Sequence, residues 1–312
     1  MVDILLAVYN GRQYLTEQID SILSQTYHEW KLLICDDCSS DGSFETALEY
    51  AKRYPEKITA IRRESPAGSA QGNFMDMLGL SDAEYTMFCD QDDVWLPEKI
   101  KLTMNKMREM ESSFGSIPLL VHTDMIVSSS DLSVISSGFM KYSGLDPSKR
   151  TINNLIVQNN ISGCTMMINS ALKELVCGTP PQLMVMHDWW IGLAAASFGR
   201  IGYVDAATMK YRQHGGNQVG AKHYKGFFTF VAGAAHKLMR VFTRHSTTDD
   251  IAMIQAQNFL SYYGEKLPPD VLDVVRAYCS LPGLSRFRKW RILCRYKLQK
   301  QNLPGIVSQF FS

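Results

Sequence analysis

The sequence predicts an α/β fold with a mixed, mostly parallel β-sheet flanked by helices, followed by a helical carboxyl-terminal region. Short apolar runs alternate with amphipathic segments of helical period through the first half of the chain, as in proteins whose parallel strands are joined by helices. Beyond about residue 222 the segments are helical and basic, and no strand is obvious. We therefore expect a main domain over residues 1–221 and a helical, basic region over residues 222–312.

Four apolar runs in the first half have the length and the polar boundaries of buried strands. These strands are expected at residues 4–10, 31–37, 58–64 and 85–90. Helices are expected within residues 11–26, 39–55, 67–80 and 97–110, where apolar side chains recur at helical spacing. The second helix has a candidate cap at Ser40 or Asp41, and the fourth has Pro97 at a position suited to its first turn.

The second half of the main domain is less regular. Strands are expected at residues 118–127, 200–205 and 208–214, and residues 128–138 have the composition of a turn-rich loop. Residues 159–172 predict a loop, a strand and the start of a helix, and residues 185–199 predict a helix that begins at Asp188.

Composition excludes several classes of protein. The chain has 312 residues, 46% of them hydrophobic, and a net charge of +1, which gives no overall attraction to nucleic acid. Seven scattered cysteines form no disulfide-framework pattern and suit a reducing compartment. The opening stretch MVDILLAVYNG does not resemble a signal peptide. We expect a cytoplasmic protein that does not bind nucleic acid.

Polar residues follow three of the expected strands directly. Asn10 follows the first strand, Asp36 and Asp37 end the second, and Asp90 and Asp92 follow the fourth. The carboxyl ends of parallel strands meet at one edge of a sheet, and ligands of open α/β sheets bind at that edge. These side chains are therefore expected to lie together around a ligand.

The stretch FCDQDDVW, residues 88–95, places three carboxylates in four positions. Like charges this close repel one another, and a divalent cation would neutralise them; Mg²⁺ and Mn²⁺ favour oxygen ligands. In an extended segment Asp90 and Asp92 would share one side, and Asp93 would point away. A turn or cap before the Pro97 helix explains these residues equally well, so this motif alone leaves both interpretations open.

Five stretches follow one another within residues 1–220: AVYNGRQYL, ICDDCSSDGS, FCDQDDVWLPEK, ISGCTMMIN and MHDWW. Together they resemble the family-two glycosyltransferases, which have the Rossmann-like GT-A nucleotide-sugar-binding fold. DQDDVW, GCTMM, HDWW and YRQHGGNQVG are most similar to bacterial rhamnosyltransferases of cell-surface polysaccharide assembly. The resemblance implies a nucleotide-sugar donor and a divalent metal, Mg²⁺ or Mn²⁺.

The resemblance also implies roles for single residues at the donor. Asp36 would accept the N3–H of a pyrimidine, and Asp90 would contact the ribose or the metal. The complete set implied at the donor is Ala7, Tyr9, Asn10, Asp36, Asn73 and Asp90. The stretch GSAQGN departs from the usual glycine-rich pattern, which leaves the contacts near Gln71 and Asn73 open.

Metal, base and acceptor residues follow from the same resemblance. Asp92 would be the main protein ligand of the metal, and His214 would reach the metal or the diphosphate. Asp188 would be the catalytic base, although the residue before it is His187 where glutamate is commoner. The residues assigned to the acceptor are Asp93, Trp95 and Trp189. Both tryptophans could equally be core residues, and Asp188 could be a helix N-cap.

This assignment agrees with the chemistry of sugar transfer. A nucleoside diphosphate leaves readily only when a cation meets its developing charge. A sugar hydroxyl is a poor nucleophile and needs a positioned base. One base and one metal suffice for a single inverting displacement through an oxocarbenium-like state, without a covalent intermediate.

Other candidate residues have ordinary structural explanations. The pair Cys35 and Cys38 matches C-x-x-C but lacks the second ligand pair of a zinc site, so we expect no functional dithiol. His122 and Asp124 alternate on an expected strand, where a structural pair is as good an explanation as an acceptor contact. Asp37 is expected to be a loop residue.

The carboxyl-terminal stretch at residues 284–300 has seven basic residues and no acidic one, interleaved with apolar side chains. A basic amphipathic helix can lie on an anionic membrane, here the inner face of the cell membrane. A solvated helix packed on the domain explains the pattern equally, and RNA binding is a third alternative. We favour the membrane by analogy with lipid-linked acceptors.

The expected function is an inverting, metal-dependent glycosyltransferase that acts on a surface-glycan or lipid-linked saccharide acceptor. The first choice of donor is dTDP-L-rhamnose, and the second is a UDP-sugar. A nucleotidyltransferase would also place aspartates at strand ends, but AVYNGRQYL lacks the glycine- and basic-rich loop such enzymes use for a triphosphate. A non-catalytic nucleotide-sugar-binding protein is the third alternative.

Overall fold

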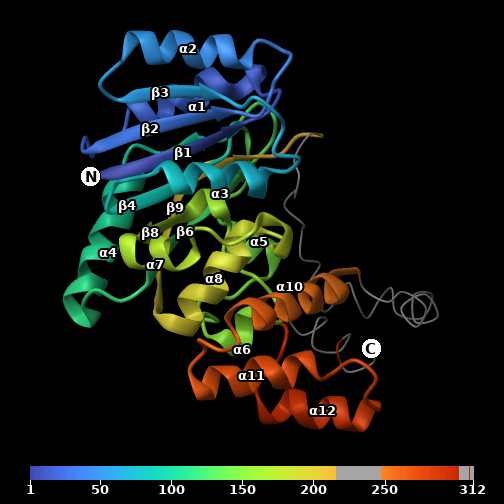
Figure 1. Cartoon of the computed structure of the whole chain (residues 1–312). Coiled ribbons are helices and arrows are strands. Elements are labelled where there is room, and N and C mark those ends of the chain that lie inside the picture. The colour runs from blue at the N-terminus through green and yellow to red at the C-terminus, as the bar shows by residue number, and fades with distance from the viewer. Residues whose placement is uncertain (216–246, 302–308, 310–312) are drawn as a thin grey trace.

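The computed structural model describes residues 1–215, 247–301 and 309 (Figure 1). Within these residues, nine strands form one mixed sheet in the order β3-β2-β1-β4-β8-β6-β9-β5, and β7 pairs with β6. The strands are β1 (Val2–Val8), β2 (Trp30–Asp36), β3 (Ile58–Arg62), β4 (Tyr85–Cys89), β5 (Val94–Trp95), β6 (Leu119–Ser128), β7 (Val134–Ser136), β8 (Met166–Asn169) and β9 (Arg200–Arg212).

The first four strands run parallel, as the alternation of strands and helices predicts. β1 lies between β2 and β4, and β3 lies outside β2. β8 then runs antiparallel between β4 and β6, whereas β6 and β9 are parallel to each other. The carboxyl ends of β1, β2 and β4 therefore meet at one edge, where the acidic residues follow.

Helices cover both faces of the sheet, and they bury the side chains on both sides of its central strands (Figure 1). On β1, Ile4, Leu6 and Val8 face one hydrophobic cluster, and Leu5 faces the other, as the two-residue period of a strand requires. The first cluster contains side chains of α1 (Arg12–Leu23), α2 (Ser43–Arg53) and α4 (Lys99–Phe114). The second contains side chains of α3 (Ala70–Leu80), α7 (Ser170–Val176) and α8 (His187–Phe198).

The expected helical carboxyl-terminal region is confirmed in its described part. It consists of α10 (Thr247–Tyr263), α11 (Pro269–Cys279) and α12 (Arg286–Arg295), drawn in orange and red in Figure 1. The indole ring of Trp190 on α8 lies 5.3 Å from the ring of Phe259 and 5.8 Å from that of Tyr263 on α10, measured between centroids. These helices thus extend the hydrophobic core of the second face. The predicted boundary near residue 221 lies outside the described residues.

The remaining helices are short. They are α5 (Phe139–Ser143), α6 (Ile152–Leu155) and the 3₁₀ turns η1 (Gly163–Thr165) and η2 (Pro181–Leu183). None of the helices in the described part of the chain has the length and apolar character needed to cross a membrane.

Several local expectations were wrong in detail. β9 is one strand rather than two, and the expected loop at residues 128–138 contains β7. The N-cap of α2 is Gly42, at φ 90°, rather than Ser40 or Asp41. A positive φ favours glycine at this position. Pro97 precedes the N-cap of α4 and so lies outside its first turn.

Candidate active site

A cavity of about 780 Å³ opens at the carboxyl edge of the sheet. Its walls come from the end of β1, the segment that enters α3, the loop after β4, residues 159–164 and the start of α8. Of the polar residues that the sequence places after strands, Asp37, Asp90 and Asp92 line this cavity, whereas Asn10 and Asp36 do not.

Asp36 and Asp37, at the end of β2, have different surroundings. Asp36 is buried, accepts the N–H of Ser39 at 3.0 Å, and lies 3.5 Å from the Arg62 guanidinium. Asp37 lines the cavity, and its Oδ1 accepts the N–H of Ala67 at 2.6 Å. The geometry therefore presents Asp37, which we expected to be a loop residue, to a ligand in the cavity rather than Asp36.

The other residues assigned to the donor divide in the same way. Ala7 and Tyr9 line the cavity, and the Tyr9 side chain is exposed. Asn73 also lines it, and its amide donates to the carbonyl of Cys35 at 3.1 Å, which ties α3 to β2. Asn10, at φ 48°, caps the neighbouring loop by accepting the N–H of Ser40, and it is not among the residues that line the cavity.

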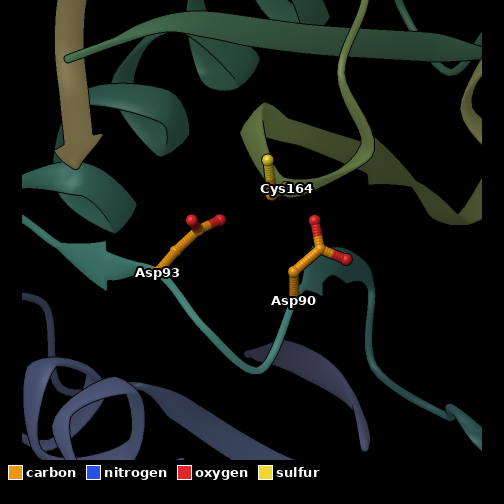
Figure 2. A group of neighbouring side chains, drawn as sticks. All are labelled: Asp90, Asp93 and Cys164. Atoms are coloured by element: carbon orange, nitrogen blue, oxygen red, sulfur yellow. The ribbon is translucent and has the colours of Figure 1, made fainter. Parts of the chain in front are cut away.

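The acidic loop, residues 90–93, follows β4 and bends rather than continuing as an extended segment. Asp90 and Asp92 line the cavity, and Asp92 Oδ2 lies 2.7 Å from Nε2 of His214. Because the loop bends, Asp93 turns toward Asp90, and one ligand atom from each of Asp90, Asp93 and Cys164 lies within 4.8 Å of the others (Figure 2). The prediction that Asp93 points away from Asp90 was wrong.

Asp93 and Trp95 lie beneath the cavity. Asp93 is fully buried, and its Oδ1 accepts the N–H of Arg212 at 3.0 Å. Trp95 is also buried, with the Lys99 ammonium 4.8 Å from its ring centroid. Neither is among the residues that line the cavity, so the geometry gives no support to their assignment as acceptor contacts. Trp189 does line it, and its Nε1 donates to the carbonyl of Leu155 at 2.6 Å.

Two sets of side chains near the acidic loop could hold a cation. Burial and the nearby charge of Asp92 raise the pKa of Asp90 to about 7. The two carboxylates repel each other, and a bound cation would neutralise that repulsion. Burial also raises the pKa of the Cys164 thiol and of Asp93 well above their ordinary values, which favours protonated groups that bind Mg²⁺ or Mn²⁺ poorly. The second set is Asp90 and Asp92, whose carboxylates line the cavity, with His214 in contact with Asp92; it offers the oxygen ligands that Mg²⁺ and Mn²⁺ favour.

Asp188 is the second residue of α8, and the N-cap of that helix is Met186. The alternative that Asp188 is an N-cap was therefore wrong. Its carboxylate lines the cavity and accepts the N–H of Gly163 at 3.1 Å and its neighbour's N–H, that of Trp189, at 2.5 Å. Burial raises the pKa of Asp188 to about 6, although both hydrogen bonds lower it. At neutral pH the carboxylate is ionised and a stronger base than an exposed aspartate.

His187 lies beside this base and is neutral. Its ring packs on Phe74, at 4.5 Å between centroids, and on Phe88, at 5.5 Å. Burial lowers the pKa of His187 to about 3. A Cβ on Gly163 would lie 2.7 Å from the Nε2 of His187, which explains the glycine in ISGCTMM.

His122, Asp124 and the C-x-x-C pair do not enter the cavity. Asp124 Oδ1 accepts the N–H groups of Met125, Phe139 and Met140, which fixes the start of α5, and His122 packs on Tyr203 at 5.0 Å. The expected structural pair between His122 and Asp124 is therefore wrong, although both roles are structural. Cys35 and Cys38 are free thiols.

Sequence reasoning missed Gln91 and Arg212, which hold the acidic loop. The Gln91 amide accepts the N–H of Tyr9 at 2.8 Å and donates to its carbonyl at 3.1 Å. Arg212 donates from Nε to the carbonyl of Asp92 at 2.7 Å. The signal available in the sequence was their position inside recognised motifs, DQDD and YRQH.

Comparison with known proteins agrees with this geometry. The chain is 28% identical to the dTDP-rhamnosyl transferase RfbG of Shigella flexneri over 226 residues, which are 69% of this chain and 74% of RfbG. It is 32% identical over 114 residues to the UDP-Glc:alpha-D-GlcNAc-diphosphoundecaprenol beta-1,3-glucosyltransferase WfgD of Escherichia coli. Those residues are 36% of this chain and 44% of WfgD.

Among solved structures, residues 1–349 of S. aureus TarS in complex with UDP-GlcNAc match with a TM-score of 0.55 and 17% identity. The match covers 99% of this chain and 89% of that one. At this identity the likeness is one of fold, and it confirms the expected GT-A architecture. A model of the family described as Glycosyl transferase family 2 matches residues 3–176. Because these residues are more than half of the chain, it belongs to glycosyl transferase family 2 and is a glycosyltransferase that takes its sugar from a nucleotide-sugar donor.

Proposed function

We propose that the protein is an inverting, metal-dependent rhamnosyltransferase that uses dTDP-L-rhamnose, with a UDP-sugar as the second choice of donor. The observation that carries this proposal is one cavity lined by Asp37, Asp92 and a buried carboxylate of raised pKa, Asp188. These are the groups that nucleotide binding, diphosphate departure and hydroxyl activation each require.

Each of these residues has a separate task. Asp37 accepts the N3–H of the pyrimidine, and Asp90, Asp92 and His214 would hold a divalent metal. That metal, when bound, neutralises the charge that develops on the departing diphosphate. Asp188 accepts the proton of the acceptor hydroxyl as the oxygen attacks the anomeric carbon from the side opposite the diphosphate. The configuration inverts in this single step, and no residue forms a covalent intermediate.

A deoxysugar donor is supported by the relative RfbG and by the apolar part of the cavity wall. Met125, Phe139, Leu145 and Met186 line the cavity together. Side chains of this kind favour the C6 methyl group of a 6-deoxyhexose over the hydroxymethyl group of glucose, because they offer no hydrogen-bond partner to the hydroxyl.

The acceptor that we propose is a surface-glycan saccharide, carried in the membrane on a lipid. The relative WfgD, a glucosyltransferase named for an acceptor linked to diphosphoundecaprenol, supports a lipid-linked acceptor. The exposed face of α12 supports contact with an anionic membrane surface. It carries Arg288, Arg291 and Arg295 beside Phe287, whose side chain is 79% exposed.

A thermal-shift panel tests this function. Ligands that bind only the folded state raise its melting temperature, so dTDP-L-rhamnose with Mn²⁺ should raise Tm more than GDP-linked sugars do. Asp92→Ala should abolish the part of the shift that depends on Mn²⁺. Asp82→Ala, at an exposed position outside the cavity, is the matched control and should behave as wild type. An Asp92→Ala protein with an unchanged Mn²⁺-dependent shift would remove Asp92 from the metal site.

A further inference from the structure

Arg212, the last residue of β9, lies under the acidic loop with 2% of its surface exposed. Its backbone N–H donates to Asp93 Oδ1 at 3.0 Å, and its Nε donates to the carbonyl of Asp92 at 2.7 Å. Its Nη1 donates to the carbonyl of Ser130 at 2.5 Å, and its Nη2 donates to Glu17 Oε2. One side chain thus joins α1, the acidic loop and the loop after β6.

The planar guanidinium makes these contacts interdependent. Its donors have a fixed fork geometry, so a carboxylate held on one side sets the direction of the N–H groups on the other. A buried guanidinium is also costly without a charged partner, and Glu17 supplies that charge from α1. Arg212 therefore links the backbone of Asp92 to α1, a helix outside the cavity, and fixes the position of that backbone relative to the helix.

His214 is held by the same arrangement. It lies two residues after Arg212, and the rings of Tyr14 and His214 are 5.0 Å apart. The Arg212 guanidinium lies 4.4 Å from the centroid of that same Tyr14 ring. Tyr14 therefore supports both side chains, one that fixes the backbone of Asp92 and one that contacts its carboxylate.

The opposite flank of the loop is fixed independently by the paired hydrogen bonds between Gln91 and the backbone of Tyr9. With both flanks tied, the loop presents the side chains of Asp90 and Asp92 to the cavity in a set geometry. We propose that Arg212, anchored by Glu17, is a positioning residue that places Asp92 and His214 and so sets the affinity of the site for a divalent cation with a nucleoside diphosphate. This inference rests on the proposed function of the cavity.

Two variants separate positioning from folding. Glu17→Ala removes the anchor from a helix residue whose side chain is 55% exposed, and alanine preserves the helix. Arg212→Lys keeps the charge and loses the fork. Asp20→Ala is the matched control, because it makes the same charge change on α1 at a carboxylate that bonds Tyr50 instead.

The experiment is a titration of Mn²⁺, followed by its electron paramagnetic resonance signal, in the presence of dTDP or UDP. We expect Glu17→Ala and Arg212→Lys each to weaken Mn²⁺ binding by about 10-fold, as is usual for partners that orient metal ligands. Asp20→Ala should bind as wild type does. In transfer assays, the two variants should regain most of the wild-type kcat at saturating Mn²⁺, because the reacting groups are intact.

Three results would overturn the inference in different ways. If wild type binds Mn²⁺ with the nucleotide and both variants bind it within 2-fold of wild type, Arg212 has a structural role only. If wild type shows no nucleotide-dependent Mn²⁺ binding, the proposed metal site itself fails, and the positioning role fails with it. A loss of kcat that excess Mn²⁺ does not restore would also contradict a positioning role.

Discussion

At the scale of single residues, the end of β2 shows how two adjacent aspartates acquire different tasks. Asp36 still pairs with β3 and turns its carboxylate toward the Arg62 side of the sheet edge. Asp37 is the first residue beyond the strand, and its carboxylate reaches the cavity and the segment that enters α3. Successive side chains of a strand point to opposite sides, so only one of the pair can face the ligand.

This arrangement predicts opposite consequences for the two substitutions. Asp37→Ala should weaken UDP or dTDP binding by about 10-fold or more, the effect of losing a hydrogen bond to a charged group. Asp36→Ala should leave affinity near that of wild type and lower the free energy of unfolding by roughly 1–3 kcal/mol, because it leaves the Ser39 N–H without its partner.

Nucleotide titration and urea unfolding of the two variants measure these effects separately. Loss of affinity in Asp36→Ala with normal binding in Asp37→Ala would return the pyrimidine contact to Asp36.

Sequence located the right group of residues but not the orientation of each. That carboxylates would gather after β2 and β4 followed from the apolar runs before them. Which of them faces the ligand depends on the residue where pairing stops and on a bend of the chain. The bend within the acidic loop turned Asp93 inward, and its partner Arg212 is 119 residues away in the sequence. Neither feature has a local signal.

At the scale of elements, strands and helices were predictable where burial controls the residue pattern. β1, β2, β4 and α8 are buried almost throughout, and their apolar runs show it. β7 was missed because Val134 and Ile135 are exposed in a serine-rich segment. The sequence predicted two strands in place of β9 because residues 205–207 are polar or small. The register against β6 shifts at the same point: Thr123 pairs with Val204, and the next residue, Asp124, pairs with Ala207.

β6 also carries a buried histidine that should make the fold sensitive to acid. Burial, with a smaller effect of Arg150, lowers the pKa of His122 to about 3. The unfolded chain binds a proton near pH 6.5, so stability is intact above that pH and falls as pH drops toward 3. The loss from this residue is about 1.4 kcal/mol per pH unit, or about 2 kcal/mol at pH 5.

His122→Phe should remove this loss while keeping the ring that packs on Tyr203. Urea unfolding at pH 7 and pH 5 tests this prediction. On going from pH 7 to pH 5, the free energy of unfolding of the variant should increase by about 2 kcal/mol relative to that of wild type. His28→Phe, at an exposed position, is the control. The same difference from wild type at both pH values would show that His122 is not the acid-sensitive group.

At the scale of the whole molecule, the carboxyl-terminal helices join the second hydrophobic face of the sheet. α10 packs on α8, the helix that carries Asp188, and Leu293 of α12 is buried in the same cluster. The rest of α12 presents arginines to solvent at the end of the molecule away from β3 (Figure 1). This places a basic surface on the same body as the active site, where a membrane could carry an acceptor.

Replacing Arg286, Arg288, Arg291 and Arg295 with glutamine should weaken binding to anionic vesicles by about 1 kcal/mol per residue. Transfer to a water-soluble acceptor should be retained, because none of these residues lines the cavity. Co-sedimentation with vesicles of anionic and of zwitterionic lipid measures the effect, and the zwitterionic vesicles are the control. If wild-type protein does not bind anionic vesicles at low salt, this surface is not a membrane contact.

The central claim is that Asp188 is the base of a sugar transfer within one donor-binding cavity, and Asp188→Asn tests it most directly. Asparagine keeps the size of the side chain, and its single oxygen can accept the N–H of Gly163, but it loses the second acceptor and cannot take a proton from a hydroxyl. Sugar transfer and donor affinity are measured on the same preparation, by product detection and by titration. We expect turnover to fall by roughly 10²–10⁴-fold, with donor affinity close to that of wild type. Turnover within a few-fold of wild type would contradict the account and remove Asp188 from the mechanism.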